Sequence, residues 1–439
     1  MLKQAYPRYV LSVLMMVSTL NVLDRALIIL LLQPIKDDLH LTDANLGFLT
    51  GIAFGLFYAT LGLPIARWAD RGNRVTIISL AVGLWGATVM LCVFVTNFVQ
   101  LVFARIAAAV GESGCMPPTY SLVGDYFPGS AERTRAMSIY MLADPLCVLL
   151  SFAAGGWVNE HYGWRMAFFL IGIPAPLVAG LVKLTVREPR PAQSQAQAER
   201  PPAPSMMDVL RTLWQQRASR HLSIGIILFF TMGTGLSPWY AAFLMRTHGM
   251  ATGELGLWLG LIFGLGGIAG TLLGGQIAAR WFANDERGQL RVSALVVAAL
   301  VPCIAVFLLL PRKLDALIAL VPLTIASNYI FGPTFALMQR LVPDAMRATT
   351  LAVVMLLGNL IGMGVGPQAV GLLSDALRPL LGGDSLRYAM LIVSLVALWS
   401  AYHLWQVGRT VAGDLAAVSR QNSPSTVAVH ELRPAAAVE

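Results

Sequence analysis

Twelve long apolar stretches limit what this chain can fold into. A bilayer crossing needs about 20 predominantly apolar residues, and each half of the sequence supplies six stretches of that kind. We place them, to within several residues, at 9–32, 46–69, 75–96, 99–124, 135–158 and 165–186, and at 221–245, 254–281, 291–310, 314–338, 348–374 and 386–407. The sequence therefore predicts an all-α, polytopic membrane protein with twelve membrane-spanning helices in two pseudo-symmetric six-helix halves.

The composition excludes a water-soluble fold. Hydrophobic residues make up 56% of the 439 positions and charged residues only 12%, against roughly 25% charged residues in soluble domains. The cysteines lie in apolar stretches without CxxC spacing, which indicates neither a disulfide framework nor a zinc site. The apolar run that begins at residue 9 lacks a small-residue cleavage site, so we interpret it as a retained first span rather than a signal peptide.

A polar segment separates the two halves, which we assign to residues 1–186 and 221–408. Residues 187–220 contain Arg187-Glu-Pro-Arg-Pro and are too polar and proline-rich to cross a bilayer. We predict a cytoplasmic linker there, with an interfacial helix near 207–217. Residues 409–439 are predicted to be a disordered cytoplasmic tail.

The distribution of Lys and Arg predicts the orientation. The N-terminus, the loops that follow even-numbered spans and the C-terminal tail hold three times as many Lys and Arg residues as the opposite loops. Because cytoplasmic loops carry the excess of positive charge, both termini and the linker are predicted to be cytoplasmic, in a cell inner membrane. The net charge of +8 then reflects topology, so no nucleic-acid partner is predicted. The chain is expected to act as a monomer in the lipid bilayer.

The two halves resemble each other. Gly47, Gly51 and Gly55 in the second span recur with the same four-residue spacing from Gly256 in the eighth span. The loops after spans 4 and 10 also correspond. Such in-register matches indicate an internal duplication, which is typical of secondary transporters.

The loop after the second span carries a recognisable charge pattern. From Ala66 to Arg74 it reads Ala-Arg-Trp-Ala-Asp-Arg-Gly-Asn-Arg. It resembles the signature loop of the major facilitator superfamily, Gly-x-Leu-Ala-Asp-Arg-x-Gly-Arg-Arg, with departures at Ala66 and Asn73. The resemblance implies that Asp70, Arg71 and Arg74 form a conformational switch, in which a carboxylate beside fixed cations pairs with a neighbouring helix in one state only. The alternative is that these cations only set the topology.

Two further motifs narrow the resemblance. Asn-x-x-Asp-Arg at 21–25 and Arg-x-x-x-x-x-Gly-Glu-Ser at 105–113 resemble the spinster-like branch of the superfamily. The likeness covers the first half well and the second half mostly by architecture. It implies secondary transport by alternating access, with the matching residues involved in substrate binding and proton coupling, and a lysophospholipid or sphingolipid-like substrate.

Ionisable residues inside the spans gather in the first half. Asp24, Arg25, Arg105, Glu112 and Asp144 all fall in its apolar stretches, where each costs at least about 2.5 kcal/mol to insert at mid-membrane. Arg105 and Glu112 are seven residues apart, so they share a helix face about 10 Å apart along the axis. We expect Asp24 to pair with Arg105 or Arg25 and Glu112 to be left free to exchange a proton. Glu112, then Asp24 and Asp144, are the predicted proton-coupling groups; a static ion network that fixes the helices is the alternative.

Cations in an apolar cavity suit a substrate with an anionic head and an apolar body. Arg25 and Arg105 are therefore predicted to bind it, and a small organic anion or a drug is the alternative. Polar and aromatic residues in spans that face the presumed cavity complete the predicted substrate site, namely Tyr120, Trp239, Tyr240, Tyr329 and Asn359. Because Trp and Tyr also favour membrane interfaces, each of these aromatic residues is alternatively a belt residue.

Other function classes fit less well. The sequence has no Walker A pattern, so an ATP-driven pump is not predicted. The six histidines are scattered over loops and span ends, so a membrane-embedded enzyme such as an acyltransferase would lack a catalytic cluster. A sensor or scaffold that does not transport is a further rival. The sequence predicts a proton-coupled secondary transporter with no cofactor and no metal.

Overall fold

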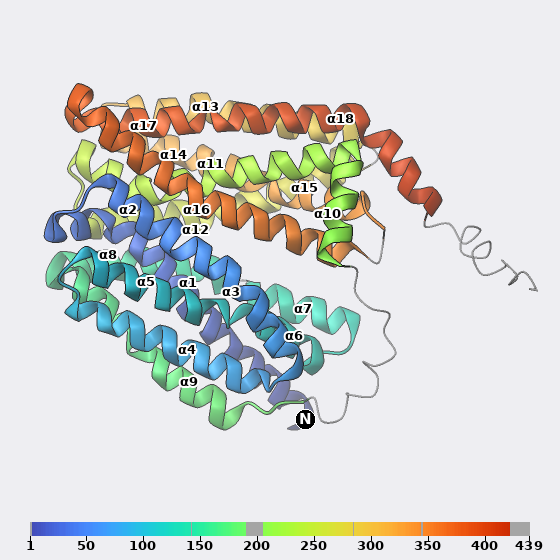
Figure 1. The fold of residues 1–439 in the computed structure, drawn as a ribbon, viewed down its shortest axis with the longest axis horizontal. Coiled ribbons are helices and arrows are strands. Elements are labelled where there is room, and N and C mark those ends of the chain that lie inside the picture. Colours follow the sequence, from blue (N-terminus) through green and yellow to red (C-terminus); the bar gives the residue numbers. More distant parts are fainter. Residues whose placement is uncertain (1, 142, 190–204, 284, 344–345, 422–439) are drawn as a thin grey trace, which may run out of the picture.

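The computed structural model describes residues 2–141, 143–189, 205–283, 285–343 and 346–421, without the side chains of residues 2–4, 63, 66, 70, 71, 130, 143, 146, 348 and 419–421. All regular secondary structure in these ranges is helical. The helices form one long bundle (Figure 1).

Side-chain caps begin several helices of the first half. Thr42 and Asn45 form a capping box at the start of α2, and Asn73 and Asn97 each accept the backbone N–H three residues on, which begins α4 and α5. The departure at Asn73 from the superfamily loop therefore has a local structural role. The helices are α1 (Leu2–Leu39), α2 (Asp43–Thr50), α3 (Ile52–Arg71), α4 (Arg74–Leu91), the 3₁₀ turn η1 (Cys92–Phe94), α5 (Phe98–Ser113), α6 (Met116–Tyr126), α7 (Ser130–Met141), α8 (Ala143–Gly172) and α9 (Pro174–Thr185).

The second half begins after a short helix in the linker. Ser205 caps this helix, and Gly249, with a φ of 62°, ends α11 in the left-handed conformation. The helices are α10 (Met206–Gln215), α11 (Arg217–His248), α12 (Thr252–Trp281), α13 (Glu286–Leu309), α14 (Lys313–Tyr329), α15 (Phe331–Arg340), α16 (Arg347–Leu381), the 3₁₀ turn η4 (Gly382–Asp384), α17 (Ser385–Ser394) and α18 (Val396–Gln421).

These helices make twelve membrane crossings. Ten stretches of the described chain are long and apolar enough to cross a bilayer, and two of them, Cys147–Thr185 and Thr349–Val418, contain a reversal. Gly163, with a φ of 82°, turns the chain within α8, a backbone conformation that glycine adopts without strain. The turn η4 reverses the chain after α16. The predicted fold class is confirmed.

The predicted boundaries need two corrections. Crossings 2, 4, 6, 10 and 12, predicted as continuous, are each divided, between α2 and α3, α5 and α6, α8 and α9, α14 and α15, and α17 and α18. The tail predicted to be disordered from residue 409 is helical as far as Gln421, and residues 422–439 lie outside the described residues. Helix α10 lies where the sequence predicts a linker helix.

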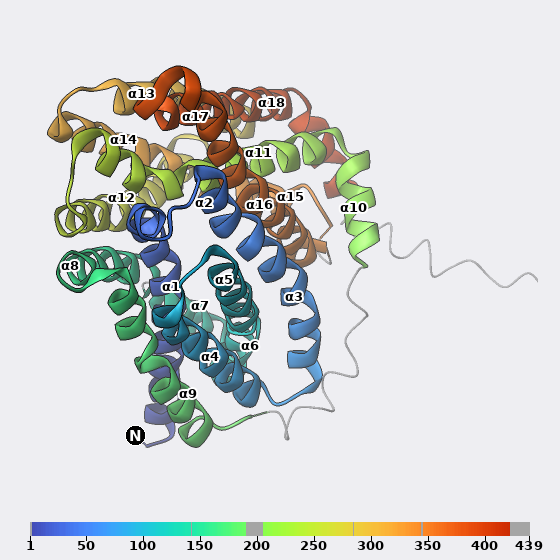
Figure 2. The ribbon, with the colours of Figure 1, turned by 60° about the vertical axis from the view of Figure 1, so that its left-hand side comes forward.

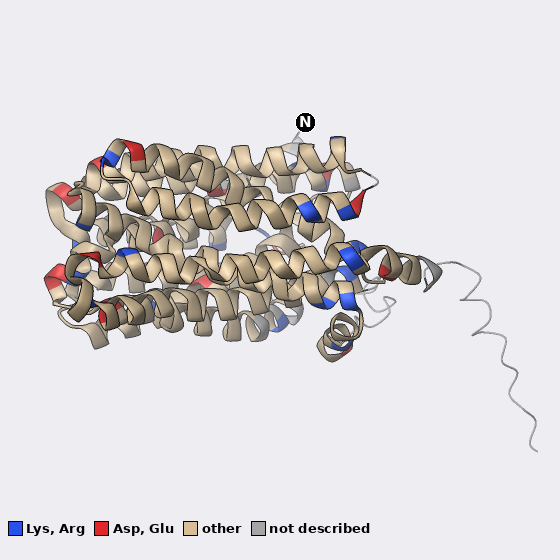
Figure 3. Cartoon of the chain, turned by 90° about the horizontal axis from the view of Figure 1, so that it is seen from above, with Lys and Arg blue, Asp and Glu red and all other residues tan. Residues whose placement is uncertain are grey.

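The two ends of the bundle differ in charge. The N-terminus, α10 and the last turns of α18 lie at one end, which we call the terminal end, and α2 lies at the opposite, far end (Figure 1). Lys and Arg gather at the terminal end (Figure 3). This asymmetry agrees with the uneven distribution of Lys and Arg in the sequence.

The halves meet through two equivalent pairs of helices. Helices α2 and α3 pack on α16, and α12 packs on α8 (Figure 2). Backbones approach closely there, because a Cβ atom at Gly47 would lie 2.6 Å from the Pro367 carbonyl oxygen and one at Gly256 would overlap the Phe152 carbonyl oxygen. The duplicated glycines thus line both contacts between the halves. At the terminal end, α7, α10 and α15 pack mainly within their own halves. At the far end, α2 of the first half packs on α16 of the second, so the bundle is closed there.

Candidate functional site

A cavity of about 190 Å³ lies between the halves. Helices α1, α2, α3 and α5 of the first half and α11 and α16 of the second line it. Its lining includes Arg25, Phe54, Arg105, Ser237 and Met363. The two arginines predicted to bind substrate therefore face one shared space.

Two buried ion pairs flank this cavity. Arg105 Nη1 donates to Asp24 Oδ2 at 2.7 Å, which is one of the two pairings predicted for Asp24, and the side chains are 3% and 0% exposed. Arg25 Nε donates to Glu112 Oε2 at 2.5 Å, and these side chains are 28% and 0% exposed. The prediction that Glu112 is left free is wrong in this state, because Arg25 reaches across from α1 to pair with it.

Aromatic rings hold the two guanidinium groups in place. Arg25 Cζ lies 5.2 Å and Arg105 Cζ 5.0 Å from the centroid of the Phe54 ring. Arg25 Cζ also lies 4.3 Å from the Tyr58 ring centroid. Cation–π contacts of this kind stabilise charge in a poorly solvated site. Helix α3, which carries both rings, thus fixes the positions of both cations.

Each ion pair retains unused hydrogen-bonding atoms. Among the described residues, Arg25 Nη2 and Arg105 Nε are buried donors without a partner, and Asp24 Oδ1 and Glu112 Oε1 are buried acceptors without one. A buried polar atom left unsatisfied costs about 1–3 kcal/mol. The cluster is therefore suited to bind an anion through the free N–H groups or a proton through the free carboxylate oxygens.

Glu112 lies at an interruption of its crossing. It occupies the last turn of α5, which ends at Ser113 with Gly114 as its C-cap, and α6 starts at Met116 with Pro117 in its first turn. Transporters commonly place binding sites at such broken helices, where polar backbone faces a cavity. The Gly-Glu-Ser followed by Pro-Pro was a sequence signal for this break.

Asp144 lies apart from the two ion pairs. It is half-buried in the first turn of α8, where Ser18 Oγ donates to its Oδ1 at 3.4 Å. Tyr120, 39% exposed, packs edge-on against Tyr140 with the ring centroids 5.8 Å apart. Neither Asp144 nor Tyr120 is among the described residues that line the central cavity.

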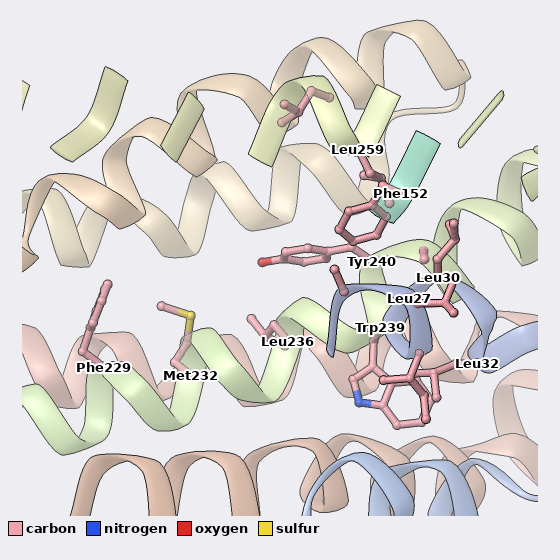
Figure 4. Packing of buried hydrophobic residues seen from close by; sticks show 14 of the residues in the cluster. Leu27, Leu30, Leu32, Phe152, Phe229, Met232, Leu236, Trp239, Tyr240 and Leu259 are labelled. Atoms are coloured by element: carbon pink, nitrogen blue, oxygen red, sulfur yellow. The ribbon is translucent and has the colours of Figure 1, made fainter. Parts of the chain in front are cut away.

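Four other residues predicted to bind substrate do not line the cavity. Trp239 and Tyr240 are 0% and 8% exposed and belong to the packed core (Figure 4). Tyr240 packs edge-on against Phe307 with the ring centroids 5.4 Å apart. Tyr329 is buried inside the second half, and Asn359 is a half-buried residue of α16.

The smaller neighbours of the two core aromatics line the cavity instead. Thr234, Ser237 and Pro238 of α11 face it. The spacing of Thr234 and Ser237, three residues on one helix face, was the sequence signal for the correct side of α11. Trp239 and Tyr240 lie on the faces that pack against other helices.

Of the three residues predicted to form the conformational switch, the structure describes the side chain of Arg74 alone. The side chains of Asp70 and Arg71 lie outside the described part of the chain. Arg74, 0% exposed, forms ion pairs with Asp125 at 2.6 Å and Glu188 at 2.5 Å. These contacts join α4 and α6 of the first half to the start of the linker after α9, at the terminal end. The sequence reasoning missed Asp125 and Glu188, which look like ordinary charges beside a span.

A second charged group closes the far end. Asp43, 2% exposed, accepts hydrogen bonds from Lys36 Nζ at 2.5 Å, from Arg246 Nη1 and Nη2 at 2.8 and 2.7 Å, and from Ser374 Oγ at 2.6 Å. Asp375 accepts from the backbone N–H of Asp43 at 3.1 Å. We call these five residues the far-end cluster. It joins α1 and α2 to α11 and α16, and the sequence reasoning missed it.

Comparisons with known proteins agree with this architecture. Residues 14–367 match the model of the Major Facilitator Superfamily. The chain is 33% identical over 412 residues to an MFS-type efflux pump of Mycolicibacterium smegmatis, covering 92% of this chain and 93% of the pump. It is 26% identical over 402 residues to Protein spinster homolog 1 of Homo sapiens, covering 84% and 73%.

A solved structure resembles the whole bundle. It is the inward-facing, unoccupied form of a bacterial homologue of the human lysosomal transporter spinster, with a TM-score of 0.81 and 28% sequence identity over 93% of this chain and 98% of that one.

Proposed function

Since this chain belongs to the major facilitator superfamily and resembles its spinster-like branch, we propose that it is a proton-coupled secondary transporter that moves an anionic, amphipathic molecule by alternating access. Family membership makes it a membrane transporter rather than an enzyme. The observation that carries the finer proposal is the pair of cavity-lining arginines, each bound to a buried carboxylate and each with a free N–H group.

The proposed coupling follows from the Arg25–Glu112 pair. Arg25 is the more exposed of the two arginines, and Glu112 is fully buried. An anion that binds Arg25 competes with Glu112 for the guanidinium group. A buried carboxylate without its cation is strongly disfavoured, so Glu112 takes up a proton when the substrate displaces it. Substrate binding and protonation thus favour each other.

The proposed orientation places the terminal end in the cytoplasm of a cell with an inner membrane. The gathering of Lys and Arg at that end supports it. The bundle is closed at the far end, and the matched spinster homologue is inward-facing, so we assign this conformation to the inward-facing state. Both termini are then cytoplasmic.

The proposed substrate class is a single-chain amphiphile such as a lysophospholipid or a sphingolipid-like compound. The free guanidinium N–H groups suit a phosphate or carboxylate head. The apolar cavity wall, which includes Ile28, Ile29 and Phe54, suits an apolar chain. Spinster homologues among the relatives support this class by analogy alone.

A small organic anion or a drug is the second candidate. The relative named as an efflux pump favours it, as does the central cavity of about 190 Å³, which is smaller than the ~300–1,000 Å³ of typical ligand pockets. Competition between alkyl phosphates of increasing length separates the two candidates, because only an amphiphile site gains affinity with every added methylene.

The decisive experiment replaces Glu112 by Gln in protein reconstituted into liposomes. We expect uptake driven by a pH gradient to fall at least about tenfold, which is ~1.4 kcal/mol of coupling, while exchange of substrate without a gradient continues. Glu254→Gln is the control, because Glu254 forms an exposed ion pair with Lys313. If Glu112→Gln still accumulates substrate with protons as the sole driving force, another group couples the proton, and Asp24 and then Asp144 are tested next.

A further inference from the structure

A second, larger cavity lies at the terminal end of the first half. It has a volume of about 690 Å³ and lies between α1, α6 and α7, and it is separate from the cavity between the halves. Its lining includes Arg8, Leu11, Met15, Glu132, Arg135 and Ile139. We call it the α1–α7 pocket. Its volume falls within the ~300–1,000 Å³ range of small-molecule sites.

The two long walls of the pocket have matching patterns. Arg8, Leu11 and Met15 are three and four residues apart on α1, so they share one face of that helix. Glu132, Arg135 and Ile139 share one face of α7 in the same way. On both helices the charged residues lie nearest the terminal end and the apolar ones lie deeper. Arg8 and Met15 are about 10 Å apart along the axis.

The cations of the pocket are available to a ligand. Arg8 and Arg135 are exposed, and neither forms an ion pair within the part of the chain that the structure describes. Arg8 lies three residues into the candidate span that starts at Ala5, which is the depth of lipid headgroups. The deeper wall is apolar and partly covered, since Leu11 is 7% exposed. The pocket therefore offers positive charge at the membrane surface and apolar surface below it.

An accessible stripe along α1 leads from this pocket to the central cavity. Ser12, Met15, Thr19 and Val22 are exposed or half-exposed and lie within about 80° of one another around the helix, with Arg25 about 60° further round. Arg25 ends the stripe in the lining of the central cavity. These residues give a molecule bound in the α1–α7 pocket accessible positions along α1 between the two cavities.

We propose that the α1–α7 pocket is a membrane-surface binding site for the anionic head of a single-chain amphiphile, held there before it moves along α1 to Arg25. The proposal rests on the proposed function, since it names where that substrate first binds. The head contacts Arg8 and Arg135, and the chain lies along Leu11, Met15 and Ile139. The Glu132 carboxylate lines the same pocket and weakens, without preventing, the binding of an anionic head to the two arginines.

The test uses dodecyl phosphate with a photoreactive diazirine on the chain next to its head. Full-length protein in phosphatidylcholine nanodiscs is irradiated with the probe, and labelled peptides are mapped by mass spectrometry. We expect labels on α1 before Met15 and on α7. In Arg8→Gln/Arg135→Gln these labels fall at least about tenfold, since two charge-assisted contacts are lost.

Two further variants keep the test decisive. Arg211→Gln/Arg217→Gln removes the same charge from exposed arginines at the same end of the bundle, and labelling stays within about twofold of wild type because neither arginine lines the pocket. Glu132→Gln should raise labelling of α1 and α7 by this probe, the opposite sign to any loss through misfolding. The proposal is overturned if Glu132→Gln leaves the labelling unchanged. It is also overturned if both double variants lower the labelling equally.

Transport measurements distinguish a pocket that binds the substrate first from a pocket that holds a structural lipid. Under saturating pH gradient, Arg8→Gln/Arg135→Gln should raise the KM for dodecyl phosphate about tenfold and leave the maximal rate unchanged. Lost labels with an unchanged KM mean that the pocket holds a structural lipid, which overturns the proposal. Labelling needs no pH gradient, so it tests the pocket independently of proton coupling. If the labels appear as expected but driven uptake survives Glu112→Gln, only the proposed function is overturned. Driven uptake that depends on Glu112, without labels on α1 or α7, overturns the pocket alone.

Discussion

The far-end cluster and the two central ion pairs both hold buried carboxylates against arginines, but they differ in where their members come from. Asp43 and Lys36 of the first half bind Arg246 and Ser374 of the second. The central pairs join α1 to α5, both in the first half. Contacts across the halves must break whenever the far end opens, whereas contacts within one half can persist through the cycle. The far-end cluster therefore has the geometry of a gate between the halves. The central pairs have the geometry of a binding site that moves as one unit with the first half.

The difference also sets the energetics. The cations of the far-end cluster keep some access to water, with Lys36 11% and Arg246 18% exposed. Opening the gate hydrates them, which offsets much of the lost attraction. The central carboxylates are 0% exposed, and no rigid-body motion of the halves alone hydrates them. A ligand can displace the cation from these carboxylates, and only a proton can then neutralise their charge.

The largest effect is expected from removing the gate carboxylate. Asp43→Asn leaves Lys36 and Arg246 close together without the carboxylate that binds both of them, a loss of about 3 kcal/mol from the closed state, or roughly 100-fold in population. Spin labels at the exposed positions Tyr162 and Leu380 should lie farther apart in this variant than in wild type, as measured by double electron–electron resonance. Asp38→Asn is the control, because its pair with Arg165 lies within one half. Equal distance distributions in Asp43→Asn and Asp38→Asn would contradict the gate.

A smaller effect is expected where the halves touch through backbone. Gly256→Ala places a methyl group against the Phe152 carbonyl oxygen, which costs about 1–3 kcal/mol as overpacking and pushes α12 from α8. The closed population at the far end should fall by about tenfold, read from the same pair of labels. Gly275→Ala, on the same helix with open space around its Cβ position, should leave the population at the wild-type value.

The smallest effect is expected at the central site. Arg105→Lys keeps the charge beside Asp24 but loses the planar fork, so the affinity for an anionic head should fall about fivefold, near 1 kcal/mol. The far-end distances should stay as in wild type. Binding of alkyl phosphates of increasing length measures this, with roughly 0.8 kcal/mol gained per buried methylene. No dependence on length, together with full affinity in the variant, would show that Arg105 is structural.

The sequence predicted features that depend on which residues lie inside the membrane-spanning stretches. It missed features that depend on how each helix is rotated about its own axis. The apolar runs predicted the crossings, and the ionisable residues inside spans 1 and 4 predicted a pair between Asp24 and either Arg105 or Arg25, of which the structure shows Arg105. The rotation of α11 about its axis follows from packing, so Trp239 and Tyr240 were assigned to the cavity although they fill the core. Residues at span ends, such as Asp43 and Arg246, are 203 positions apart and resemble ordinary loop charges until the fold brings them together.

The glycine-lined contacts between the halves have a consequence for the entropy of the transport cycle. A contact made by side chains freezes their rotamers each time it forms, at up to ~2 kcal/mol for a long side chain. Where Gly47 meets the Pro367 backbone and Gly256 meets the Phe152 backbone, the facing glycines have no rotamers to lose. These two surfaces can part and rejoin with little ordering of the chain, which leaves the substrate and the proton to decide which state is populated.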